Sequence, residues 1–169
     1  MNTIKITKTN AEYDNVSAAT KFVAKNTDDK RRECLFSIGG KLLATDGFRL
    51  LETKTNLPAG AYEIAKNTKT EILLAEIQLE PPQFDAVLKS WVNARDAQTT
   101  KTKNAHIFCC EIAKKTEGFF NTDFLKTAFD ALKTAAETEI AFWQMAENTP
   151  LQLTNGSERV LIMPLRWHA

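Results

Sequence analysis

The sequence has few of the residues that build disulfide frameworks or metal sites. It contains three cysteines and two histidines in 169 residues. Cys34, Cys109 and Cys110 all lie in apolar, strand-like runs, which indicates buried, reduced thiols and not a set of disulfides. His106 and His168 are the only histidines, and no ligand spacing typical of a zinc site is present. We therefore predict no metal site and no cofactor.

The sequence also lacks the short motifs that carry catalysis. It has no Gly-x-Ser-x-Gly nucleophile elbow, no phosphate-binding loop and no His-x-x-x-His pair. Asp46 is the one carboxylate that invites a role as a base, but it has no partner at a useful spacing. The chain is therefore predicted to be non-enzymatic, without catalytic residues.

The sequence also has no large excess of charge of either sign and no long apolar run. The 22 basic and 21 acidic side chains leave a net charge of +1, so no global attraction to nucleic acid follows from the composition. No apolar run approaches the ~20 residues that span a bilayer, and residues 1–5 contain no hydrophobic signal core. We expect a cytoplasmic protein with no membrane partner.

A repeated strand–turn–strand pattern is the strongest positive feature. In residues 42–51 the dipeptide Asp46-Gly47 predicts a two-residue hairpin turn. Asn155-Gly156 occupies the same place in residues 151–162. Both copies read Thr-Asp/Asn-Gly, then an arginine, then aliphatic residues. The sequence therefore predicts two copies of one structural unit.

The first copy is predicted to consist of a strand, a helix and a meander. Thr9 and Glu12 match a capping box for a helix that buries Val16, Ala19, Phe22 and Val23. Gly39-Gly40 predicts a tight turn. The expected strands are 1–8, 33–38, 41–45, 48–53, 61–65 and 71–78.

The second copy repeats the order of helix and three strands. The middle of the chain, before this copy, shows helical spacing of apolar residues in 84–93 and a polar, Thr-rich loop in 96–104, and a strand pattern follows in 106–113. Asn121 or Thr122 is expected to cap a helix that ends near Lys133. Strands are expected at 139–145, 151–154 and 159–165. The pattern predicts an α+β fold with a largely antiparallel sheet and helices on one face.

Two motifs resemble a known family. Residues 44–50, Ala-Thr-Asp-Gly-Phe-Arg-Leu, resemble the Ala-Thr-Asp-Gly-His-Arg-Leu signature of the bacterial DNA polymerase III β subunit, the sliding clamp. The tail at 160–166 resembles that family's Val-Val-Met-Pro-Met-Arg end, and 118–133 looks like the helix of its last domain. Phe48 departs from the pattern, because the family usually has histidine there.

The resemblance implies a DNA-clamp-like domain of two pseudo-symmetric βαβββ units. We expect residues 1–169 to form one such domain, with a first unit at about 1–66, an insertion-like middle at about 67–104 and a second unit at about 105–169. In the family, six such domains close a ring around duplex DNA, and one chain carries three of them. This chain has room for one, so a homo-oligomer is expected if a ring forms.

The resemblance also assigns candidate binding residues by motif match. The family's two motifs border a hydrophobic pocket for short peptides of polymerases and other clamp partners. The matching positions here are Thr45, Gly47, Phe48, Arg49, Leu50, Leu161, Met163, Pro164, Leu165 and Arg166. The candidate DNA-facing residues are Lys21, Lys25, Lys126 and Lys133, whose alternative interpretation is a solvated helix face.

Three functions remain open at this stage. The first is a processivity factor or docking platform in DNA replication or repair, with double-stranded DNA and polymerase or clamp-loader peptides as partners. The second is an interaction module that inhibits clamp partners. The third is a structural clamp-fold protein without DNA contact. Salt-dependent affinity for long duplex DNA separates the first two, because only a ring requires it.

Overall fold

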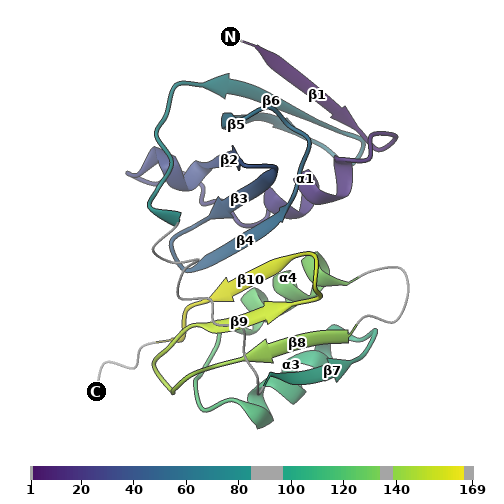
Figure 1. Cartoon of the computed structure of the whole chain (residues 1–169), viewed down its shortest axis with the longest axis vertical. Coiled ribbons are helices and arrows are strands. Elements are labelled where there is room, and N and C mark those ends of the chain that lie inside the picture. The colour runs from purple at the N-terminus through teal and green to yellow at the C-terminus, as the bar shows by residue number, and fades with distance from the viewer. Residues whose placement is uncertain (1, 85–96, 134–138, 166–169) are drawn as a thin grey trace. The chain divides into compact units, whose positions relative to one another are not determined.

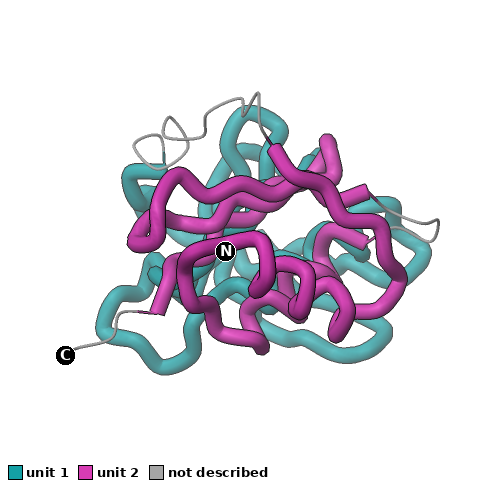
Figure 2. The backbone as a smooth tube through the Cα atoms, turned by 90° about the horizontal axis from the view of Figure 1, so that it is seen from below, with its two compact units in different colours: residues 1–90 teal, residues 91–169 magenta. Residues whose placement is uncertain are grey.

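The computed structural model describes residues 2–84, 97–133 and 139–165 of the chain. The chain divides into two compact units, unit 1 at residues 1–90 and unit 2 at residues 91–169 (Figure 2). Each unit contains its own strands and helices (Figure 1). The units are therefore described one at a time.

Unit 1 is built on an antiparallel sheet in the order β1-β6-β5-β2-β3-β4. β6 lies between β1 and β5 and is an integral part of this sheet. The expected strands are confirmed to within a few residues at their ends. Their bounds are β1 Thr3–Thr7, β2 Cys34–Ile38, β3 Lys41–Thr45, β4 Arg49–Lys54, β5 Gly60–Asn67 and β6 Glu71–Ile77.

The β2–β3 turn follows the prediction from residue type. Ile38 pairs with Lys41, so Gly39 and Gly40 alone make the connection. Their φ angles are 57° and 74°. Two consecutive positive φ angles define a type I′ turn, which glycine adopts without steric cost.

The helix of unit 1, α1, is shorter than the apolar spacing predicted. It spans Tyr13–Ala19 and packs against β3, β4 and β6, so Phe22 is buried beyond its end. The expected capping box is also wrong. The Glu12 carboxylate does not cap the helix but accepts hydrogen bonds from Thr55 Oγ1 at 2.7 Å and Asn56 N at 2.9 Å. A single-turn 3₁₀ segment, η1 (Lys30–Glu33), precedes β2.

Unit 2 has an antiparallel sheet in the order β10-β9-β8-β7. Its strands are β7 Gln98–Lys101, β8 Glu139–Trp143, β9 Leu151–Thr154 and β10 Arg159–Ile162. The predicted second helix is confirmed as α4, Thr122–Leu132. Asn121 Oδ1 caps it by accepting from Asp123 N and Phe124 N, at 2.8 and 3.4 Å.

Residues 106–113, predicted as a strand, form a helix instead. α3 spans Ala105–Lys115, and Asn104 Oδ1 accepts from His106 N at 2.8 Å as its N-cap. Its Phe108 ring packs against Phe129 of α4, with centroids 5.2 Å apart. Ile107, which the strand interpretation would place on the core face, is exposed.

The change from strand to helix also changes the environment of the cysteines. Cys109 is buried in α3 while its neighbour Cys110 is exposed, so the expectation of three buried thiols is wrong for Cys110. Burial raises the pKa of the Cys34 thiol to about 11 and also raises the pKa of Cys109. These two thiols are therefore protonated and weakly reactive at neutral pH.

Two further expectations concern the middle of the chain. The predicted helix at 84–93 lies outside the described residues, apart from Phe84, whose ring lies edge-on to Phe36 at 5.7 Å. The loop predicted at 96–104 is wrong in part, because β7 forms there and pairs with β8. The fold class is confirmed: the chain is α+β with antiparallel strand pairing in both units.

Candidate functional site

The turn of unit 1 that carries the sequence motif is held by side-chain hydrogen bonds to its own backbone. Thr45 pairs with Leu50, so residues 46–49 form a four-residue loop and the predicted two-residue turn is wrong. Thr45 Oγ1 accepts from Gly47 N at 3.0 Å and donates to Arg49 O at 2.7 Å. Asp46 Oδ1 accepts from the backbone N–H of residue 48 at 2.9 Å and of Arg49 at 2.8 Å.

Arg49 ties this loop to the segment after α1. Its guanidinium donates to Asp46 Oδ2 through Nε at 2.8 Å and Nη2 at 2.6 Å, and both side chains are about nine-tenths buried, with 11% and 10% exposed. Nη2 also donates to Lys21 O at 3.1 Å, and the guanidinium lies 5.1 Å from the centroid of the Phe22 ring. A charged pair with these additional contacts fixes the loop firmly.

The remaining candidates of this loop differ in exposure. Phe48 is 61% exposed, the highest value among the candidate residues for which the structure gives one. Leu50 is 6% exposed and belongs to the core of unit 1. Gly47 has a φ of +91°, a conformation that favours glycine. Phe48 therefore presents an apolar surface to solvent, whereas Leu50 supports the sheet.

Unit 2 contains a second loop with the same hydrogen bonds, residues 155–158 between β9 and β10. Thr154 Oγ1 accepts from Gly156 N at 3.0 Å and donates to Glu158 O at 2.7 Å. Asn155 Oδ1 accepts from Ser157 N at 2.9 Å and Glu158 N at 2.8 Å. The match shows that Glu158, and not the arginine identified from the sequence, corresponds to Arg49.

The tail of unit 2 presents apolar side chains beyond the end of β10. Leu161 is buried at 5% exposure and faces the core, but Met163 and Leu165 are 38% and 46% exposed. The tail is anchored where Leu165 N donates to Phe119 O at 2.7 Å. Phe119 is itself 59% exposed and was not among the candidates.

The outcome for the last two tail candidates differs. Pro164 is half-buried between the two exposed tail residues, and Arg166 lies outside the described residues. The sequence signal for Phe119 was present, since it belongs to the Gly-Phe-Phe run before α4. Its exposure, however, depends on tertiary packing. In unit 2 the exposed side chains of Met163, Leu165 and Phe119 thus lie on two segments that the Leu165–Phe119 backbone hydrogen bond joins.

The four candidate DNA-facing lysines fall into two groups. Lys21 and Lys25 are exposed but follow α1 instead of lying on it. On α4, Lys126 pairs with Asp123 at 3.7 Å, and Lys133, the C-cap residue, forms an ion pair with Asp130 at 2.6 Å. The acidic partners balance the charge of the α4 pair locally.

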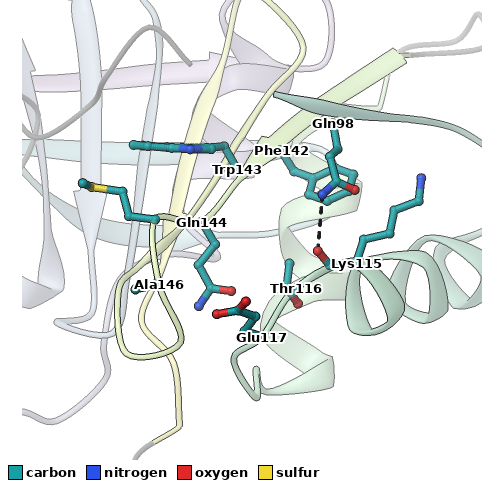
Figure 3. Close-up of a pocket in the computed structure, with 9 residues that line it drawn as sticks. Gln98, Lys115, Thr116, Glu117, Phe142, Trp143, Gln144 and Ala146 are labelled. Atoms are coloured by element: carbon teal, nitrogen blue, oxygen red, sulfur yellow. Dashed lines mark hydrogen bonds between the residues drawn. The ribbon is translucent and has the colours of Figure 1, made fainter. Parts of the chain in front are cut away.

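Two hollows within single units add candidate sites that motif reasoning missed. In unit 1 a cavity of about 410 Å³ lies beside Lys25 and Lys30, where Lys30 Nζ bridges Glu33 and Glu63 at 3.1 and 2.7 Å. In unit 2 a cavity of about 290 Å³ lies at the end of α3 along β8 (Figure 3). Each cavity is lined by residues from several separate segments of the chain, so no local sequence motif predicts it.

Metal and membrane sites were searched in the part of the chain that the structure describes. Within it, no three His, Cys, Asp or Glu side chains are grouped in a way that would hold a metal ion. None of the helices in residues 2–84, 97–133 and 139–165 is long and apolar enough to cross a bilayer.

The fold of the whole chain matches those of solved sliding clamps. It aligns with a DNA polymerase sliding clamp from Pseudomonas aeruginosa at a TM-score of 0.62, with 11% identity, over 98% of this chain and 66% of that one. The chain has a sliding-clamp-like fold. Comparisons with protein-family models and with curated proteins found no match.

Two further solved clamps give the same result. The Helicobacter pylori β clamp bound to a DNA ligase peptide aligns at a TM-score of 0.63, with 11% identity, over 98% of this chain and 66% of that one. The Bacillus subtilis sliding clamp aligns at 0.60, with 13% identity, over 99% and 65%. The chain thus spans just under two-thirds of the length of these clamps, and at such identity the likeness establishes the fold.

Proposed function

We propose that this chain is a non-enzymatic clamp-type protein of DNA replication or repair that binds short peptides of polymerases or clamp loaders. Three observations support the proposal: the two sequence motifs, the clamp-like fold, and the apolar side chains that both motifs expose. One of the fold's solved relatives is described as bound to a DNA ligase peptide. Peptide binding is the function that these observations favour together.

The observation that carries the proposal is the exposed ring of Phe48. The corresponding residue of the unit 2 loop is Ser157, which is also exposed, and that loop keeps the same hydrogen bonds. The loop geometry therefore does not require an aromatic residue at this position. An aromatic side chain that is 61% exposed without a structural need is free to serve as an anchor for a ligand.

The tail of unit 2 adds the second group of binding residues. Met163 and Leu165 are partly exposed on a segment that a 2.7 Å backbone hydrogen bond fixes to Phe119. Methionine adapts its unbranched side chain to varied apolar anchors. We propose that Phe48 in unit 1 and Met163 with Leu165 in unit 2 contact peptide, and each group is tested by itself.

The experiment measures binding of a fluorescent clamp-binding peptide, taken from a DNA ligase, by anisotropy. Phe48→Ser copies the residue of the unit 2 loop, and Met163→Ser shortens an exposed side chain, so both variants keep the fold. We expect each to weaken binding about tenfold, from the loss of one apolar anchor of about 1.4 kcal/mol. Ile38→Ser, at a position 42% exposed elsewhere in unit 1, is the matched control and should bind as the parent chain does. Absence of binding by the parent chain would refute the proposal.

DNA contact is the part of the proposal that the charge distribution supports least. The two candidate lysines at α4 have acidic partners, which leaves Lys21 and Lys25 as the stronger candidates. Affinity for duplex DNA should fall with salt if phosphates are contacted, and Lys21→Ala with Lys25→Ala should flatten that dependence. Salt-independent or absent binding would favour a peptide-binding module that acts without encircling DNA.

Assembly is tested by absolute mass in solution, measured by light scattering over a range of concentration and salt. Six domains of this type close a ring in the clamp family, so a hexamer would support a processivity factor. A monomer or dimer would favour peptide capture or inhibition of clamp partners. The peptide-binding assay is independent of this result.

A further inference from the structure

The outward face of α3 carries two side chains of the kinds that bind metal ions. His106 and Cys110 are four residues apart and are therefore neighbours on one side of the helix. Both are exposed, and the distance from Cys110 Sγ to His106 Nε2 is 3.8 Å. In the strand predicted from the sequence, the two residues would lie about 13 Å apart. The helix therefore brings together a pair that the strand prediction had separated.

The spacing of the two donor atoms is close to that of two ligands of one zinc ion. With a Zn–S distance of ~2.3 Å and a Zn–N distance of ~2.1 Å, a tetrahedral centre places sulfur and nitrogen about 3.6 Å apart. The 3.8 Å between Cys110 Sγ and His106 Nε2 is within about 0.2 Å of that value. Two histidines at the same four-residue spacing on a helix bind zinc in metalloproteases. Thiolate and imidazole together favour zinc over magnesium or calcium.

The helix holds this pair in place before any metal binds. Its first turn is fixed by Asn104 Oδ1, which accepts from His106 N at 2.8 Å. The opposite side of α3 is buried, and Phe108 and Ile112 are both 0% exposed. His106 and Cys110 are thus kept on the outward face, and a preorganised pair of ligands loses little conformational freedom on binding.

One chain supplies two of the four ligands that a structural zinc site requires. In residues 2–84, 97–133 and 139–165, no three His, Cys, Asp or Glu side chains are grouped in a way that would hold a metal ion. A second copy of the chain, related by a two-fold axis through the metal, would supply the same histidine and cysteine and complete a tetrahedral site. The two thiolates would balance the charge of Zn²⁺, so the contact would bury no net charge.

The surface around the pair is suited to contact between two helices. Ile107, 48% exposed, lies three residues from Cys110 on this face, and Ala113 beyond it is small and exposed. A second helix that covered them would remove apolar surface from water. Lys114 is also exposed, and its long side chain can keep the ammonium group in solvent. The partner helix would therefore meet apolar side chains next to the ligands.

We propose that His106 and Cys110 form half of a structural zinc site that joins two copies of this chain through their α3 helices. The site goes beyond the proposed peptide binding and does not depend on it, because Phe48, Met163 and Leu165 have no part in it.

The test follows the mass of the full chain by light scattering, first in EDTA and then with added zinc ions. A phosphine reductant keeps the thiols reduced throughout, which excludes a disulfide between copies. Zinc should double the mass found in EDTA and saturate at one ion per two chains, and further EDTA should reverse the change. Co²⁺ in place of zinc should give the charge-transfer absorption of a thiolate ligand.

Variants identify the ligands. Cys110→Ser and His106→Gln alter exposed side chains, so both keep the fold, and each should abolish the zinc-dependent doubling. His168→Gln alters the other histidine of the sequence and is the matched control, which should dimerise as the parent chain does.

Three results would overturn the zinc site: no effect of zinc on the mass, saturation at one ion per chain, or a doubling that survives in Cys110→Ser. Peptide binding is measured separately in EDTA, where Cys110→Ser should bind as the parent chain does. Failure of the zinc site therefore leaves the proposed function intact, and failure of peptide binding leaves the zinc site to be decided by the mass measurement.

Discussion

The β3–β4 loop of unit 1 and the β9–β10 loop of unit 2 have the same backbone hydrogen bonds but different side-chain anchors. In unit 1 the last loop residue, Arg49, donates to Lys21 O after α1 and forms a buried ion pair with Asp46. In unit 2 the first loop residue, Asn155, donates to Leu132 O at the end of α4, at 2.8 Å. Each loop is thus tied to the region at the C-terminal end of its own helix by a different position.

The comparison separates what the fold needs from what it permits. Both loops keep threonine, a short Asx residue and glycine, because those three side chains satisfy or permit the backbone geometry. The side chain of the third loop residue makes no such contribution, and that residue is Phe48 in one loop and Ser157 in the other. The residue at that position can therefore vary without loss of the loop geometry, and it can be selected for function. For this reason Phe48 is central to the proposed peptide binding.

The largest expected difference between the loops comes from the ion pair. Asp46→Ala removes the carboxylate oxygen that accepts from two backbone N–H groups and leaves the Arg49 guanidinium, 11% exposed, without its carboxylate. Breaking a buried pair costs about 3 kcal/mol or more. Asn155→Ala removes three hydrogen bonds to backbone groups and one to the Glu158 carboxylate but breaks no ion pair, at about 1–2 kcal/mol. Chemical denaturation, with amide exchange at Leu51 and Leu153 to follow each unit, measures both.

Asp46→Asn is the matched control, because it turns the unit 1 loop toward the residue of its counterpart. It keeps an oxygen to accept the two N–H groups and removes the charge, so it should cost less than Asp46→Ala. Equal losses for Asp46→Ala and Asn155→Ala would show that the ion pair contributes nothing beyond its hydrogen bonds, and the distinction between the loops would disappear.

The glycines of the two loops should respond almost alike. Gly47 and Gly156 both have a φ of 91°, and alanine in this region costs about 1–2 kcal/mol. A Cβ at Gly47 would also lie 3.1 Å from the Arg32 guanidinium, whereas nothing lies within 4 Å of one at Gly156. The end of an arginine side chain moves easily, so Gly47→Ala should be only slightly more destabilising. A difference well above 1 kcal/mol in thermal or chemical unfolding would contradict this equivalence.

The sequence predicted what local side chains determine. Thr-Asp/Asn-Gly marked both loops, Gly39-Gly40 marked the type I′ turn, and Asn121 marked the start of α4. It did not predict the loop length, because Asp46-Gly47 is equally compatible with a two-residue and a four-residue connection. The outcome depends on the Asp46 carboxylate, which bonds two N–H groups and Arg49 at once.

The helix α3 shows where local propensity failed. Residues 106–113 are rich in β-branched, aromatic and cysteine side chains, which favour strands. Packing decides otherwise, since Phe108 and Ile112, one helical turn apart, are both buried and Phe108 meets the Phe129 ring of α4. Asn104 before them and Lys115 at the end were usable signals for a helix start and end. The exposure of Phe119 depends on tertiary contacts and had no local signal.

The outer strand pairs of the two sheets provide the smallest expected difference. In unit 1, hydrogen bonds from Lys66 and then Lys5, at 2.5 and 2.9 Å, lower the pKa of Glu71 to about 2. In unit 2 a hydrogen bond from Lys101, the largest cause, lowers the pKa of Glu139. A carboxylate with a depressed pKa in the folded state stabilises it fully above the unfolded value of about 4.5. That stabilisation is lost as the pH falls from about 4.5 toward 2.

We therefore expect Glu71→Gln to reduce the loss of stability between pH 5 and about 2 more than Glu139→Gln does. Both carboxylates lie at the surface, so the effects should be small and should shrink further in high salt. Melting temperatures of the parent chain and both variants, measured across this range at low and high salt, test the order. Because Glu71 binds two lysines and Glu139 binds one, a larger effect at Glu139 would mean that the outer strands of unit 1 are not held by these ion pairs in solution.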